Sequence, residues 1–234
     1  MTEWRSVAGA LFPDGHEIEQ RGDLLRGEGR CGAQPFTVIG TTNHAEVGVE
    51  LALAMAAAVL ETVRANPGRP LLFLIDTKGQ RLRHRDELLG INSFMAHLGK
   101  CVEIARQRGH RILGLIYDQA LSGAFISNAM MADLCAALPE AEIRVMGLPA
   151  MARITRIAEE RLRALSETSP VFAPGAINYL RMGAIDALWS DDLPGRLMEA
   201  LRRADATDPR SASGSARGGR MLAQAVSERV AVDD

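Results

Sequence analysis

Two segments of the sequence place glycine and polar residues close behind apolar runs, where backbone donors can reach a bound ligand. The first, Asp76–Gln80 (DTKGQ), follows the run LLFLI, and the second, Ala120–Ala124 (ALSGA), follows the run ILGLIY. Glycine permits a ligand to approach the backbone closely, and N–H groups at the start of a helix are unpaired donors. We predict that four backbone N–H groups stabilise an oxyanion such as an enolate: those of Gly79, Gln80, Gly123 and Ala124. The alternative is that the two glycines serve only as turn residues.

Three side chains near these segments are further candidates for contacts with a substrate. Lys78 is suited to pair with a carboxylate or a phosphate, and the alternative is an exposed lysine in a loop. Tyr117 lies shortly before the second segment and Ser122 lies within it, and both carry hydroxyl groups that can donate a proton. For each of these two residues the alternative is a structural role.

The cysteine and histidine positions do not form a metal-binding pattern. Cys31, Cys101 and Cys135 are far apart, and no pair has the spacing of a zinc ligand set or of a disulfide framework. His97 and Cys101 have the spacing that brings side chains together on a helix, but a metal site needs more ligands, so we expect ordinary packing. We predict no metal site, and reduced thiols in a cytoplasmic protein.

The hydrophobic pattern predicts the elements that position these residues. Apolar runs predict strands at 34–41, 71–76, 111–117 and 142–146. Helical periodicity predicts a first helix with Asn43 as its N-cap and a separate long helix that ends near residue 108. Further helices are expected over 124–137, from Pro149 onward, and over 176–188 and 193–204. A polar loop is expected at 77–85. The alternation indicates an α/β architecture with mostly parallel strands, either doubly wound or a ββα spiral.

Composition separates a main domain from a terminal tail. Residues 1–204 form the predicted domain, whereas residues 205–234 form a tail that begins with a stretch rich in Ser, Gly, Arg and Asp and ends with a short amphipathic helix. The net charge of −2 gives no attraction to nucleic acid or to an anionic membrane. The longest apolar stretch, Val47–Leu60, is too short to span a bilayer, and the N-terminus lacks the pattern of a signal peptide.

Three segments carry a resemblance to a known family. LLFLIDTKGQ, RILGLIYDQALSGAFISNAMMAD and IRVMGLPAMARI are similar to the carboxyltransferase branch of the crotonase superfamily, over about Pro35–Arg156. The chain most resembles the gamma subunit of biotin-independent malonate decarboxylase. The resemblance implies a crotonase-like ββα spiral of the acyl-CoA carboxyltransferase type. It also implies that the third segment contributes substrate contacts through Leu148 and Pro149.

The sequence departs from the pattern of related acyl-CoA carboxylase carboxyltransferases in each segment. Lys78 stands where those proteins have proline, the second segment has fewer glycines, and Gly147–Ala150 replaces a Ser-Pro-Glu element. Fewer glycines are consistent with a narrower pocket that need not admit biotin. The same departures are compatible with a catalytically silent scaffold that only supports a beta subunit.

The resemblance also implies a reaction and partners. A homologous beta subunit would share the site that converts malonyl-S-acyl-carrier protein to acetyl-S-acyl-carrier protein and CO2 through an enolate. The acyl group would be carried on a prosthetic group derived from dephospho-CoA. No cofactor would bind this chain directly, and it is not a biotin carrier, because it contains no Met-Lys-Met attachment sequence. A free-standing acyl-thioester hydratase or hydrolase of the same superfamily would need an acid/base pair, and the two segments contain no clear glutamate pair.

Overall fold

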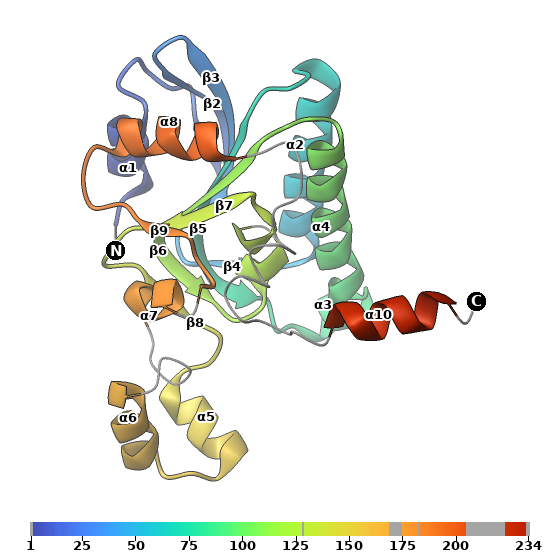
Figure 1. Ribbon diagram of the computed structural model, residues 1–234, viewed down its shortest axis with the longest axis vertical. Helices are drawn as coiled ribbons and strands as arrows, with labels where there is room; N and C mark the ends of the chain where they lie inside the picture. The colour runs from blue at the N-terminus through green and yellow to red at the C-terminus, as the bar shows by residue number, and fades with distance from the viewer. Residues whose placement is uncertain (1, 128, 169–174, 182, 205–222, 233–234) are drawn as a thin grey trace.

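The structure is a computed structural model that describes residues 2–127, 129–168, 175–181, 183–204 and 223–232 (Figure 1). One sheet runs through its centre. The strands lie in the spatial order β1 (Glu19–Arg21), β2 (Leu24–Cys31), β3 (Gln34–Thr41), β5 (Leu71–Gln80), β6 (Ile112–Leu121), β7 (Leu134–Ala137) and β9 (Ala187–Leu188). β1, β2 and β3 pair antiparallel, whereas β3, β5, β6, β7 and β9 pair parallel. The mostly parallel sheet predicted from the apolar runs is therefore confirmed.

Helices cover both faces of the sheet. α2 (Val49–Ala65) and α4 (Ile91–Gln107) pack together on one face, and α1 (Trp4–Leu11) and α8 (Leu193–Arg203) lie on the other (Figure 1). Side chains of a strand alternate between faces, so in β5 Phe73 and Ile75 contact the α2/α4 side, while Leu72 and Leu74 contact the α1/α8 side. Both layers are fully buried, which explains why this strand reads as a continuous apolar run.

Two short strands extend the sheet beyond its central part. β4 (Ala45–Val47) pairs with the end of β5, and β8 (Glu142–Arg144) pairs with the end of β6. Strand–strand–helix units result, since β3 and β4 lead into α2, and β7 and β8 lead into α5 (Leu148–Thr155). This order is the ββα arrangement, one of the two architectures that the sequence pattern left open.

Several predicted helix and strand boundaries are wrong, mostly because short strands that the sequence pattern did not predict occupy these segments or pair with them. β5 continues to Gln80 through the expected loop at 77–85, because β4 supplies a hydrogen-bonding partner. α2 begins at Val49 after Gly48, because Asn43 adopts a left-handed backbone and leads into β4. Short 3₁₀ turns and β7 replace the helix expected over 124–137. α7 (Ala176–Arg181) ends early because β9 follows it.

Other elements agree with the pattern. Pro149 lies in the first turn of α5, as predicted. The helix expected to end near 108 is divided into α3 (His84–Leu88) and α4, with Gly90 in the left-handed region between them. α5 and α6 (Glu159–Thr168) project from the sheet (Figure 1). A terminal helix, α10 (Ala223–Val232), is present, whereas the expected tail residues 205–222 lie outside the described residues. None of the described helices is long and apolar enough to cross a membrane.

Candidate functional site

The two glycine-containing segments meet at the ends of β5 and β6. A β-carbon placed on Gly79 would lie 2.4 Å from the Ser122 Cβ, and one placed on Gly123 would lie 3.3 Å from the Gln80 Oε1. The Ser122 hydroxyl donates a hydrogen bond to the Gln80 Oε1 at 3.4 Å. The structure therefore brings together four of the residues that the sequence analysis selected, although more than 40 residues separate the two segments in the chain.

Backbone conformation explains why these positions need their residues. Gly79 has a φ of +109°, which residues with a β-carbon rarely adopt, and it lies against the second segment. Ser122 has a φ of +59°, and its N–H donates to the Arg144 O of β8 at 3.0 Å. β4 and β8 thus hold the two segments in place, one from each side.

The N–H groups of the two segments differ in their partners. The Gly79 N–H donates to the Thr77 Oγ1 at 3.0 Å in a buried position, so this predicted donor is already occupied. The Arg81 N–H donates to the Val47 O of β4 at 2.9 Å. Because successive N–H groups of a strand point to opposite sides, the Gln80 N–H points away from β4. The half-buried Gly123 makes no hydrogen bond through its N–H with any residue that the structure describes.

The start of the following turn continues the second segment. Ala124 is buried and begins the 3₁₀ turn Ala124–Ser127. It packs in a small apolar cluster with Val47 and Ala52 on the α2 side. The open donor of Gly123 therefore lies at the entrance of a helical turn, where N–H groups are directed outward. Such a position suits an oxyanion.

The remaining predicted contacts divide into accessible and inaccessible residues. Lys78 is exposed on β5. Leu148 is half-buried and Pro149 is exposed at the start of α5, which follows β8. Tyr117 is only 1% exposed, and its hydroxyl donates to the Thr41 O at 2.9 Å. Burial also raises the pKa of the Tyr117 hydroxyl above its ordinary value. The expectation that Tyr117 contacts substrate is therefore wrong, because the side chain is part of the core.

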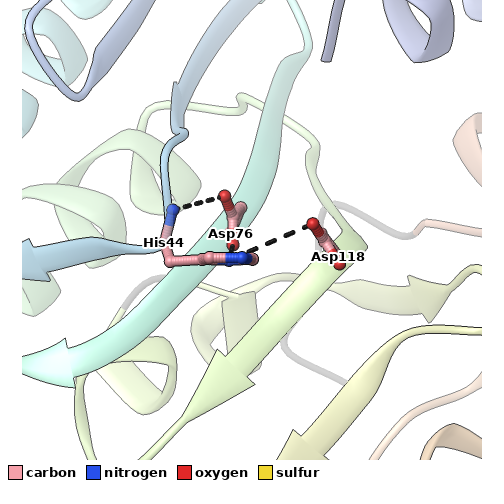
Figure 2. A group of neighbouring side chains, drawn as sticks. All are labelled: His44, Asp76 and Asp118. Atoms are coloured by element: carbon pink, nitrogen blue, oxygen red, sulfur yellow. Dashed lines mark hydrogen bonds and ion pairs between the residues drawn. The ribbon is translucent and has the colours of Figure 1, made fainter. Parts of the chain in front are cut away.

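A polar cluster that the sequence analysis did not predict lies beside these segments (Figure 2). His44 binds Asp76 twice: its backbone N–H donates to Asp76 Oδ2 at 2.7 Å, and its Nδ1 lies 2.7 Å from Asp76 Oδ1. Asp118 of β6 lies on the other side, with its Oδ2 4.0 Å from the same Nδ1. Asp76 stands at the end of an apolar run, which was the only available signal, and nothing local pointed to His44.

The cluster contains donors of the kinds that bind divalent metals. One atom from each of His44, Asp76 and Asp118 lies within 4.8 Å of the others. In this structure both Asp76 oxygens are engaged by His44, so hydrogen bonds already satisfy that carboxylate. Elsewhere, the His97 Nε2 and Cys101 Sγ lie 3.6 Å apart on α4, which agrees with the packing contact expected from their spacing.

Comparisons with known proteins identify the family. Residues 42–234 match the family described as malonate decarboxylase gamma subunit. The chain belongs to this family. It is 32% identical over 199 residues to the malonyl-S-ACP:biotin-protein carboxyltransferase MADD of Malonomonas rubra, which covers 75% of this chain and 68% of that relative. The predicted family is confirmed.

Solved structures agree with this membership of the malonate decarboxylase gamma family. The chain resembles a chain of a Pseudomonas malonate decarboxylase MdcD–MdcE hetero-dimer with a TM-score of 0.74 and 27% identity, covering 94% of this chain and 98% of that chain. A chain of a Pseudomonas malonate decarboxylase hetero-tetramer bound to coenzyme A gives 0.76 and 25%, covering 98% of each. Transcarboxylase 12S, at 18% identity and a TM-score of 0.71, covers 85% of this chain and 41% of its own, and shows the fold alone. The predicted crotonase-like carboxyltransferase fold is confirmed.

Proposed function

We propose that this chain, together with a homologous beta subunit, forms the site that decarboxylates malonyl-S-acyl-carrier protein to acetyl-S-acyl-carrier protein and CO2. The observation that carries the proposal is the Gly123 N–H, which has no partner among the described residues and lies at the entrance of a turn beside Gln80. Family membership supports the same assignment. In the proposal, the domain formed by residues 1–204 carries the chemistry, and residues 205–234 are an appended tail.

The reaction requires stabilisation of negative charge on a thioester oxygen. Loss of CO2 leaves two electrons on C2, which delocalise as an enolate onto that oxygen, and a proton then returns to C2. Donors fixed in place before the reaction stabilise such a charge, at about 3 kcal/mol for each well-placed donor. We assign this role to the N–H groups of Gly123 and Gln80, and Ala124 begins the turn that positions Gly123. Because its N–H is occupied, Gly79 serves instead to hold the segment in its conformation.

Side chains at the surface of the same region suit the rest of the substrate. Lys78 is exposed and carries a positive charge that can attract the carboxylate of the malonyl group. Ser122 is half-buried beside Gln80, where it can contact the acyl group. Leu148 and Pro149 supply apolar contacts at the start of α5.

The partners follow from the relatives. One of the Pseudomonas structures is an MdcD–MdcE hetero-dimer and another is a malonate decarboxylase hetero-tetramer, which supports a beta subunit as partner of this chain. The name of the relative in Malonomonas includes a malonyl-S-ACP, which supports a substrate held on an acyl-carrier protein. We propose that the acyl group is carried on a prosthetic group derived from dephospho-CoA, with no cofactor bound directly to this chain. The buried free thiols Cys31, Cys101 and Cys135 are consistent with a cytoplasmic location.

A second acceptor for the carboxyl group has specific support. The relative in Malonomonas is named as a biotin-protein carboxyltransferase, so transfer of the carboxyl group to a biotin protein is the competing reaction. Our proposal is direct release of CO2 without biotin. The two reactions differ in their sensitivity to avidin, which sequesters biotin.

The test is CO2 release from a malonyl thioester by this chain alone, by its beta partner alone and by the co-expressed pair, each with and without avidin. We expect release only from the pair, and no effect of avidin. Activity of this chain alone would indicate a free-standing enzyme. Release that avidin abolishes would indicate the biotin-dependent reaction, and an assembled pair without any release would contradict the malonyl assignment.

A further inference from the structure

We propose that His44, hydrogen-bonded to Asp76, is a positioning residue that holds β4 against β5 and thereby fixes the Gly79–Gln80 backbone of the oxyanion site. This inference rests on the proposed function for its catalytic consequence. Its structural part, the control of the β5 end by a residue of the β3–β4 connection, stands on contacts within this chain alone.

His44 contacts both oxygens of the buried Asp76 carboxylate. The Asp76 side chain is 2% exposed and the His44 side chain 17% exposed. The His44 backbone N–H and ring Nδ1 lie 2.7 Å from Asp76 Oδ2 and Oδ1 respectively. The Asp76 N–H in turn donates to the Thr41 Oγ1 at 3.3 Å. Because a buried carboxylate without partners is unfavourable, these contacts favour a single position for the β3–β4 connection.

The backbone at this connection needs such contacts. Asn43 and His44 are consecutive residues in the left-handed region, with φ values of +59° and +50°. Residues with a β-carbon avoid this region, so two in succession persist only where the surrounding structure holds them. Asn43 is held by its side chain, which donates to Asp23 Oδ1 at 3.1 Å, and His44 is held by Asp76.

β4, the strand that follows His44, holds the Gly79–Gln80 segment in place. Ala45 begins β4, and its carbonyl accepts a hydrogen bond from the Thr77 Oγ1 at 2.7 Å. The same Oγ1 accepts the Gly79 N–H at 3.0 Å. Val47 closes β4, pairs with Gln80 and accepts the Arg81 N–H at 2.9 Å. The contacts form a continuous chain from Asp76 and His44 to the residues on both sides of Gln80.

The cluster also connects the two strands that carry the glycine segments. Asp118 lies on β6, four residues before Ser122, and faces the His44 ring (Figure 2). Its Oδ2 is 4.0 Å from the His44 Nδ1 and accepts the Thr2 N–H at 3.0 Å. His44 thus lies between carboxylates of β5 and β6, the two strands that carry the glycine segments.

The test compares substitutions of His44 in the assembled complex. His44→Ala removes the side-chain donor, whereas His44→Asn keeps a donor near the position of Nδ1 and tolerates the left-handed backbone. We expect His44→Ala to lower kcat at least 10-fold with KM within about 2-fold, since substrate contacts remain but the donors lose their alignment. His44→Asn should recover kcat to within about 3-fold of the wild type. His97→Ala, which removes an exposed histidine of α4, is the matched control.

A second measurement does not depend on activity. Hydrogen exchange of the amides of Gly79–Arg81 should be at least about 10-fold faster in His44→Ala than in the wild type, and near the wild-type rate in His44→Asn. If His44→Ala fails to assemble, Asp76→Asn serves instead, because it replaces one carboxylate oxygen that contacts His44 with an amide nitrogen and keeps the shape of the side chain. Asp76→Asn should show the same faster exchange and lower kcat. Unchanged exchange and kcat in these variants, or an Asn variant as slow as the Ala variant, would overturn the inference. A wild-type complex that releases no CO2 would instead contradict the proposed function and leave the exchange result to decide the structural part.

Discussion

Gly79 and Ser122 touch across the ends of β5 and β6 so closely that a β-carbon at position 79 would lie 2.4 Å from the Ser122 Cβ. The contact joins two segments that approach each other only in the folded chain. It leaves no room for a side chain at Gly79, whose φ of +109° also excludes other residues. The position is therefore a structural requirement of the candidate site.

Gly79→Ala should destabilise the full chain by about 3 kcal/mol, the sum of backbone strain and overpacking. Gly32→Ala is the matched control, because Gly32 has a φ of +59° but no described atom lies within 4 Å of a β-carbon placed there, so only strain applies. Urea unfolding measures both. Equal losses of stability in the two variants would show that the contact with Ser122 contributes nothing.

The buried ion pair between α4 and the segment before β7 should be essential for stability. Arg106 is 3% exposed and its Nε lies 2.6 Å from Asp133 Oδ1, whose side chain is fully buried. Arg106→Met removes the positive charge that pairs with this buried carboxylate, to which the Ile112 N–H still donates, and should cost about 3–5 kcal/mol in unfolding free energy. Arg196→Met is the control, because its pair with Asp191 is exposed and should cost less than about 1 kcal/mol. Similar losses for the two variants would contradict this prediction.

The acid side of the stability profile should depend on Arg81. Its guanidinium binds Asp86 through two 2.8 Å contacts, and it also contacts Glu50 at 2.6 Å. The hydrogen bond from Arg81 lowers the pKa of Asp86 from 3.8 to about 2. The pKa of Glu50 falls from 4.5 to about 2, mainly through a hydrogen bond from Arg85 and to a smaller extent through one from Arg81. Carboxylates with lowered pKa values stabilise the fold above their unfolded values and lose that contribution as the pH falls toward 2.

Arg81→Met should therefore be less stable than the wild type at neutral pH, and the difference should shrink as the pH falls from about 4.5 to about 2. Urea midpoints of both proteins across this range give the difference directly. Arg83→Met, which replaces an exposed arginine of the same loop, should leave the profile unchanged. A difference between wild type and Arg81→Met that is constant with pH would exclude the proposed role of the two carboxylates.

Enolate formation predicts a reaction without CO2. The assembled pair should exchange the C2 protons of an acetyl thioester with solvent deuterium, because reprotonation of the enolate is reversible in principle. The exchange should be slower than decarboxylation but well above that of the beta partner alone. Mass spectrometry of the recovered thioester measures it. The absence of exchange from a pair that releases CO2 would argue against a stabilised enolate.

The sequence predicts the central strands and the two glycine segments because their signals are local. Apolar runs identify β5 and β6, and the glycines stand out at the end of each run. β4 could not be predicted in the same way, because it contains only three residues and exists through pairing with β5. β8 was predicted as a strand over 142–146, but its pairing with the end of β6 could not be predicted from local signals. The occupied N–H of Gly79 and the buried hydroxyl of Tyr117 depend on those long-range partners too.

The cluster of His44 and Asp76 could not be predicted from the sequence, because it too depends on a long-range contact. The two residues are 32 positions apart, and their contact depends on the left-handed backbone at Asn43 and His44. Asn43 looked like an N-cap because it precedes a helical pattern, but its side chain bonds Asp23 of an earlier turn. Local propensity could not reveal that the chain turns there into a strand.

The most direct test of a catalytic role for this chain is turnover by an intact pair that carries bulk at Gly123. Among the residues that the structure describes, a β-carbon there meets only the Gln80 Oε1 at 3.3 Å, the end of a flexible side chain, so the fold should tolerate substitution. Gly9→Val on α1 is the matched control, because no residue in the described part of the chain lies within 4 Å of a β-carbon there. If the Gly123 N–H stabilises the enolate, Gly123→Val should lower CO2 release at least 100-fold in a fully assembled complex, while Gly9→Val releases CO2 at the wild-type rate. Wild-type turnover by an intact Gly123→Val complex would show instead that this chain is a scaffold and that the beta subunit performs the chemistry.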